Sequence, residues 1–172
     1  MNHVLMDRGG EKVKKVVLMS VVALLALFTM IVSPVKAIAR EPYWEHVEGS
    51  VTGAPDRVWQ ANGIMHLEGL PFVGSYVGTL GIGIMEVCME HMAVNTETGM
   101  GTCLATWTVV IGENTLSGSA NGRIMGGLSG TSEGYFRGTQ GTGEFEGIVK
   151  WGTYSLNFAT GILEAEGVII YH

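Results

Sequence analysis

The sequence predicts an all-β domain, best described as a single antiparallel up-and-down β-barrel of about eight strands. Three observations lead to this prediction. Apolar and polar residues alternate in short segments throughout residues 40–172, which is the pattern of strands with one buried face. Many of the 26 glycines interrupt these segments where turns and corners are expected. After residue 39, no stretch long enough for a typical helix has a convincing helical period.

Residues 1–39 differ from the rest of the chain. An uncharged apolar run of 17 residues, 16–32, follows a basic segment. Ala37, Ile38 and Ala39 have the small-x-small form of a signal-peptidase site, which predicts a signal peptide removed before Arg40. An uncleaved signal-anchor helix is the alternative, because the run is at the lower edge of membrane-spanning length. In both cases we expect the barrel to be secreted or held outside the membrane, with membrane contact only through residues 16–32.

The composition of residues 40–172 excludes some partners. This part has five basic residues and fourteen acidic ones. Phosphate binding needs clustered lysine and arginine, so neither nucleic acid nor an anionic lipid surface is expected to bind the domain. The chain has no P-loop, no HExxH and no Gly-x-Ser-x-Gly motif, and we therefore predict no cofactor.

The first expected strands lie before residue 81. Residues 44–53 alternate apolar and polar side chains, with Val47 on the face expected to be buried. Residues 57–69 have mostly apolar odd positions, and a bend is expected at Asn62-Gly63. Glycines within residues 72–80 permit coiling or a bulge in the third segment.

Residues 83–93 and 102–111 form the clearest hairpin, and 115–125 follow as a half-buried strand. A register that places Cys88 opposite Cys103 would bring the two within disulfide range. An even number of cysteines in an exported domain favours that bond. Two buried thiols or a metal pair are the alternatives, although no Cys-x-x-Cys spacing supports a metal.

Residues 132–139 and 143–152 are expected to be strands joined by a tight glycine turn, and 153–158 and 162–171 form the last hairpin. The face of 143–152 predicted to point into the core consists of Phe145, Gly147, Val149 and Trp151. Lys150 is then expected outside, and Gly147→Val is expected to overpack the core. The segments provide eight or nine strands, and closure into a barrel would leave no exposed edge. An open sandwich is the alternative.

Residues 142–147, Thr-Gly-Glu-Phe-Glu-Gly, follow Phe-Arg-Gly-Thr at 136–139. This run resembles the GTGxFxG signature of small secreted Gly-rich β-barrel proteins, which are similar in architecture to allene oxide cyclase and dirigent barrels. The resemblance covers about residues 102–170. It implies the barrel fold, and the cyclase and dirigent barrels use acidic residues in the cavity. No acid of this chain aligns with those positions, so no catalytic residue carries over.

Four residues are candidates for a ligand site. Trp59 and Trp107 lie on apolar faces, where they would line a cavity or simply pack the core. Glu86 and Glu90 share a strand face and would suit general acid-base catalysis if buried. A solvent-facing position is the alternative for both acids.

Two His-x-Glu pairs are candidates for a metal site. His46 with Glu48, and His66 with Glu68, each lie on one face of an expected strand. Two adjacent strands would bring four nitrogen and oxygen ligands together, which suits zinc or another transition metal. A solvated outer face is the alternative.

Two functional hypotheses follow from the sequence. The first is a non-catalytic barrel that binds a small apolar ligand, or is structural and self-associating as a homo-oligomer. The second is a cyclase- or isomerase-like, or dirigent-like, enzyme acting in the barrel cavity. An enzyme of this kind needs a buried acid beside aromatic rings. Glu86, Glu90, Glu164 and Glu166 are the candidate acids for that role.

Overall fold

The computed structural model describes residues 39–171, which form one antiparallel sheet of ten strands. The predicted signal segment lies outside the described residues, apart from Ala39. The strands are β1 (Ala39–Val51), β2 (Arg57–Ala61), β3 (Ile64–Glu68), β4 (Leu70–Gly78), β5 (Gly81–Asn95), β6 (Gly101–Ile111), β7 (Asn114–Met125), β8 (Thr131–Gly141), β9 (Val149–Asn157) and β10 (Ile162–Tyr171). Two 3-10 turns, η1 (Gly127–Ser129) and η2 (Gly143–Phe145), follow β7 and β8. No helix within 39–171 has the length and apolar character to cross a membrane.

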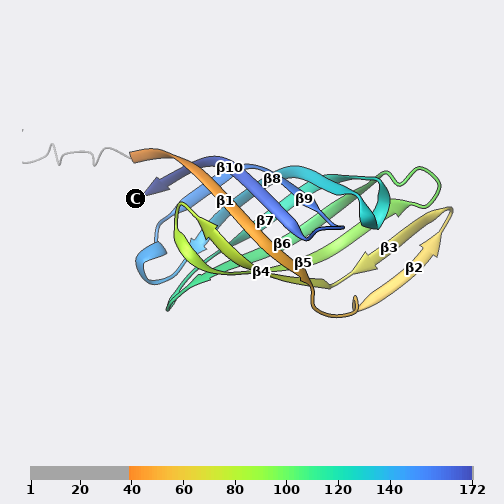
Figure 1. Ribbon diagram of the computed structural model, residues 1–172, viewed down its shortest axis with the longest axis horizontal. Helices are drawn as coiled ribbons and strands as arrows, with labels where there is room; N and C mark the ends of the chain where they lie inside the picture. Colours follow the sequence, from red (N-terminus) through yellow and green to blue (C-terminus); the bar gives the residue numbers. More distant parts are fainter. Residues whose placement is uncertain (1–38, 172) are drawn as a thin grey trace, which may run out of the picture. The chain divides into compact units, whose positions relative to one another are not determined.

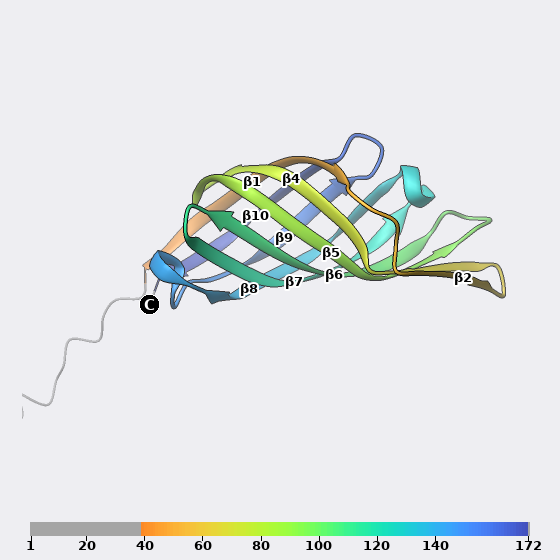
Figure 2. The same ribbon diagram turned by 90° about the horizontal axis from the view of Figure 1, so that it is seen from below.

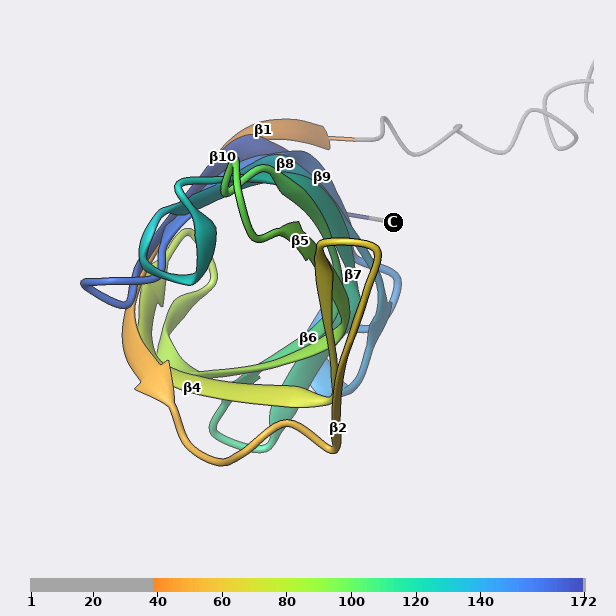
Figure 3. The same cartoon turned by 90° about the vertical axis from the view of Figure 1, so that its right-hand side faces the viewer.

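Eight of the strands close into a barrel. The order around it is β5-β4-β1-β10-β9-β8-β7-β6, and the pairing of β6 with β5 completes the ring (Figure 3). Buried side chains alternate with more exposed ones most clearly in β4, β5 and β6, as expected where one face of the sheet points inward. The predicted closed antiparallel barrel is therefore confirmed, and the open sandwich is wrong.

The two remaining strands form an extension at one end of the barrel. β2 pairs with β3, and β3 pairs with residues 92–95 of β5, beyond the part of β5 that β4 covers. The hairpin reaches away from the end where β1 begins and β10 finishes (Figures 1 and 2). The expected bend at Asn62-Gly63 is a tight turn instead. Both residues have positive φ, 51° and 75°, as a two-residue hairpin loop requires.

Small residues inside the barrel make room for large aromatic ones. Gly118 on β7 and Gly138 on β8 pair directly, and Gly118 also pairs with Trp107 on β6. A Cβ atom on either glycine would overlap the indole ring of Trp107. The packed core therefore depends on bare backbone at these two positions.

The segment 143–152 differs from its prediction. Residues 143–145 form η2, and one strand, β9, replaces the two expected from residue 143 to 158. Phe145 is buried as predicted, but Gly147 is exposed with φ 78°. In β9 Lys150 points inward and Trp151 outward. The expected overpacking by Gly147→Val is therefore wrong, because the turn moves the register of the following strand by one residue.

Candidate functional site

The lumen of the barrel contains a cavity of about 40 Å³. Its wall is almost entirely apolar and includes Met85, Val87 and Met89 from one strand, β5. The residues lining it are Glu45, Met85, Val87, Met89, Cys103, Ala105, Trp107, Ala120, Ser132, Phe136, Tyr154, Leu156 and Leu163. A single water needs at least about 10–15 Å³ measured in this way, so the cavity has room for a few small heavy atoms.

Trp107 presents an unused hydrogen-bond donor at this cavity. Its side chain is 5% exposed, and its Nε1 is the one fully buried side-chain nitrogen or oxygen in residues 39–171 without a hydrogen-bond partner. Buried polar groups in native proteins are nearly always paired. Because Trp107 also lines the cavity, its unpaired indole N–H indicates where an acceptor oxygen would be stabilised.

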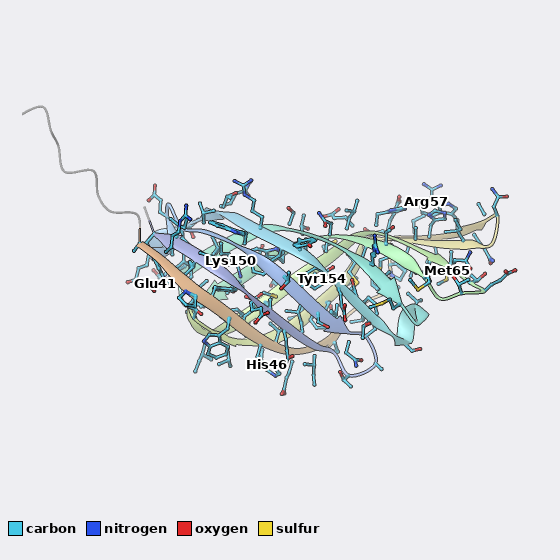
Figure 4. All side chains as sticks on the ribbon, turned by 90° about the horizontal axis from the view of Figure 1, so that it is seen from above. Glu41, His46, Arg57, Met65, Lys150 and Tyr154 are labelled. Carbon is cyan, nitrogen blue, oxygen red and sulfur yellow. The ribbon has the colours of Figure 1, made fainter. Side chains whose placement is uncertain are left out.

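A buried ion pair lies beside Trp107. The Nζ atom of Lys150 donates to Oε2 of Glu45 at 2.8 Å, and the two residues are 0% and 5% exposed. The hydroxyl of Tyr43 accepts from Lys150 and donates to Glu45. It also lies 3.2 Å from the hydroxyl of Tyr76. Strands β1, β4 and β9 thus contribute to one polar cluster that crosses the lumen; Lys150 and Tyr154 mark β9 in Figure 4.

Aromatic rings surround the ammonium group of Lys150. The distances from Nζ to the ring centroids are 4.1 Å for Trp107, 4.4 Å for Tyr43, 5.3 Å for Phe136 and 6.0 Å for Tyr76. Ring faces attract a cation within about 6 Å, and more strongly where water is excluded. The barrel therefore holds a cationic side chain in an aromatic cage with a single carboxylate as counter-ion.

Burial dominates the electrostatics of this cluster. It lowers the pKa of Lys150, while the charge and hydrogen bond of Glu45 act in the opposite direction. Burial also raises the pKa values of Tyr43 and Tyr76, and the Glu45 carboxylate adds to both increases. Replacing a buried ion pair by apolar side chains is often neutral or stabilising. Stability alone therefore does not explain why a lysine and a glutamate occupy the lumen.

The predicted ligand residues fall in three different environments. Trp107 is one of the residues that line the cavity. Trp59 lies on β2 in the extension, where it stacks on His66 at 4.7 Å and carries the guanidinium of Arg57 at 4.6 Å from its ring centroid. Glu86 and Glu90 are exposed on the outer face of β5, so their prediction as cavity acids is wrong.

The predicted metal site does not assemble. His46 lies 3.2 Å from Glu48 and 3.6 Å from Glu164 on the outer face of β1 and β10. His66 lies on β3, which is not a neighbour of β1, and its ring nitrogen is 3.3 Å from that of His91. Figure 4 shows His46 on the barrel and Met65, the neighbour of His66, on the extension. Together with Glu68, these residues form no group of three metal ligands within 39–171; the prediction is wrong because β4 and β5 lie between the two strands.

The predicted disulfide is absent, and both cysteines are free. Cys88 is opposite Thr106, and Cys103 is opposite Met92, so the pairing of β5 with β6 leaves the two cysteines three to four residues out of register. Cys103 points into the cavity, and Cys88, between the buried Val87 and Met89, points out. Burial raises the pKa of the Cys103 thiol to about 11, so this group is an unreactive thiol at neutral pH.

Sequence reasoning missed the two charged residues of the lumen. Glu45 is two positions before Val47, on the face that was already expected to be buried. Lys150 is the only lysine after residue 39, but the register error in 143–152 placed it outside. A charged residue at an inward position was the available signal for Glu45.

Comparisons with known proteins give little further information. The sequence matches no protein-family model and no curated protein. Among solved structures the fold is similar to that of a Diels Alderase, AbmU, from Streptomyces koyangensis, with 12% identity and a TM-score of 0.42. The match covers 84% of this chain and 73% of the other. A similarity of this size assigns no activity to the chain.

Proposed function

We propose that the barrel binds a small, mostly apolar molecule that carries one hydrogen-bond acceptor, and that it does so in the lumen. The observation that carries this proposal is the unpaired Nε1 of Trp107, a residue that lines the cavity. Leaving a buried donor unsatisfied costs about 1–3 kcal/mol. A carbonyl or hydroxyl oxygen bound beside Trp107 would remove that cost.

The walls of the cavity indicate how such a molecule would fit. At about 40 Å³ the cavity is far below the roughly 300–1,000 Å³ of drug-sized sites. Met85 and Met89 form part of its wall, and methionine side chains adapt easily to new neighbours because they are unbranched and flexible. The ligand is therefore expected to be small and to enter with rearrangement of the β5 methionines.

The outward acids favour binding over the cyclase-like alternative. Glu86, Glu90, Glu164 and Glu166 all face solvent, which removes the acids on which that alternative was based. Glu45, the acid that lies in the lumen, is paired with Lys150.

The signal-like residues 1–39 support action of the barrel outside the cytoplasm. Protein sequencing of the exported form and light scattering test the remaining proposals, signal cleavage and self-association.

A titration with a homologous series of 2-ketones, followed by tryptophan fluorescence, tests the proposal. Wild type and Trp151→Phe, a change on the outer face, are expected to bind equally. Trp107→Phe, which keeps an aromatic ring but removes the donor, should bind roughly 2- to 12-fold more weakly, as for loss of one hydrogen bond. Equal binding by Trp107→Phe would contradict the site. Native mass spectrometry of protein from its own source would reveal a retained ligand directly.

A further inference from the structure

Lys150 is the only amine side chain in residues 40–172, and it is fully buried inside the barrel. Lys150 itself does not line the cavity, but three side chains in contact with its amine do: the carboxylate partner Glu45 and two of the caging rings, Trp107 and Phe136. A ligand in the cavity therefore reaches Nζ when one of these side chains moves aside.

The polar contacts of Nζ are those that a reacting amine needs. The Glu45 carboxylate accepts its proton at 2.8 Å, and the Tyr43 hydroxyl bridges the amine and the acid. The unpaired N–H of Trp107 belongs to the ring over which Nζ lies at 4.1 Å. A donor for a carbonyl oxygen, an amine and a proton carrier therefore occur together in one enclosed site.

We propose that Lys150 forms a Schiff base with an aldehyde or ketone in the lumen, with Glu45 carrying the protons. This inference rests on the proposed binding of a small molecule there. It adds the ligand class, a carbonyl compound, and a covalent step.

The reaction balances with the groups present. Glu45 takes one proton from the Lys150 ammonium, and the freed lone pair forms a bond to the carbonyl carbon. The π electrons of the carbonyl move to its oxygen, which receives the proton released by the nitrogen. Glu45 then protonates the hydroxyl, the C–O bond breaks, and water leaves. Ammonium and carbonyl are thus converted to iminium and water, without any oxidant or reductant.

The site is suited to both the ammonium reactant and the iminium product because the two carry the same charge. The iminium retains the single positive charge of the ammonium, opposite the Glu45 carboxylate and within the same four rings. Burial also lowers the pKa of Lys150, which increases the fraction of neutral amine available for attack.

Reductive trapping of the full chain tests the inference. The protein is incubated with butanal and cyanoborohydride at neutral pH, and modified lysines are located by peptide mass mapping. The chain has four other lysines, 12, 14, 15 and 36, which serve as internal references. We expect Lys150 to be modified at least about 10-fold faster than they are, and this preference to disappear in urea.

The variant Glu45→Gln tests whether Glu45 transfers protons in the reaction or only lies close to Lys150. It should slow the trapping of Lys150 by about 10²-fold or more, as for removal of a general acid-base group, without changing the four reference lysines. A circular dichroism melt shows whether the variant is folded. Lys150→Met, which keeps an unbranched side chain, should abolish trapping in the barrel while the four reference lysines react as in wild type.

The ketone titration and the trapping experiment together distinguish failure of the covalent step from failure of the binding proposal. If 2-ketones bind Trp107→Phe more weakly than wild type, as expected above, and Lys150 is not trapped, the covalent step is wrong and the binding site stands. If 2-ketones do not bind and Lys150 reacts no faster than the reference lysines, both proposals fail.

Discussion

The barrel lumen and the β2–β3 extension contain the same kind of interaction in opposite surroundings. In the lumen the Nζ of Lys150 lies 4.1 Å from the centroid of Trp107, and in the extension the guanidinium of Arg57 lies 4.6 Å from that of Trp59. The first pair is buried, whereas Arg57 is exposed and Trp59 is partly buried. Such contacts contribute about 0.5–1 kcal/mol at exposed sites and about 2 kcal/mol or more when desolvated. The residue types are similar, and burial decides how much each contact contributes.

The largest expected difference comes from breaking the buried pair. Lys150→Ala should lower the free energy of unfolding by about 3–5 kcal/mol, because Glu45 is left buried without a counter-ion. Arg57→Ala, in the extension, should change it by no more than about 1 kcal/mol. Urea unfolding measures both. The double variant Lys150→Met, Glu45→Leu should recover most of the loss, and a double variant no more stable than Lys150→Ala would contradict this account.

Alkaline pH should affect the lumen through its tyrosines. Burial raises the pKa of Tyr76 above its ordinary value of 10.0, so above pH 10 the unfolded chain loses a proton that the folded protein keeps. Stability therefore falls as pH rises, by about 1.4 kcal/mol per pH unit for each such group. Tyr76→Phe should reduce the loss of stability between pH 10 and 11 by about 1 kcal/mol, since the unfolded tyrosine is only partly ionised at pH 10; urea unfolding at the two pH values measures it.

Trp59→Phe, a change in the extension, is the control for this slope and should leave it as in wild type. An unchanged slope for Tyr76→Phe would mean that the Tyr76 hydroxyl ionises as easily in the folded protein as in the unfolded chain.

An added methyl group tests how tightly the lumen is packed. In Gly138→Ala the new Cβ would overlap the ring of Trp107, and overpacking of this kind costs about 1–3 kcal/mol. Val58→Ala, on the exposed face of β2, should stay within about 0.5 kcal/mol of wild type. Thermal unfolding compares the two. Equal melting temperatures for the two variants would show that the lumen accommodates the added methyl group without a loss of stability.

The smallest effect is expected for Trp59→Ala. It removes the stacking on His66 and the contact with Arg57, which should cost about 1 kcal/mol because both are largely solvated. Hydrogen exchange of the β2–β3 amides should increase while the barrel amides keep their protection. Faster exchange throughout the barrel would show that the extension supports the core.

The sequence was sufficient for the fold because alternation of apolar and polar residues is a local signal. It was insufficient where a turn or a hairpin sets the register of a strand. The turn η2 before β9 exchanged the positions of Lys150 and Trp151. The predicted pairing of the two cysteines failed because the β5–β6 register places Cys88 opposite Thr106 and Cys103 opposite Met92. Neither the turn nor the register alters the composition of a strand, so neither leaves a periodic signature. The lumenal cluster depends on pairings across non-neighbouring strands, which local patterns do not contain.

The β2–β3 hairpin, which turns at Asn62-Gly63, gives the sheet an edge strand. The barrel strands pair with one another around the closed ring, whereas within residues 39–171 β2 pairs with β3 on one side and with no strand on the other. Strand-to-strand pairing with another polypeptide would be directed there. β2 has only five residues and starts with Arg57; short length and positive charge both discourage edge-to-edge aggregation.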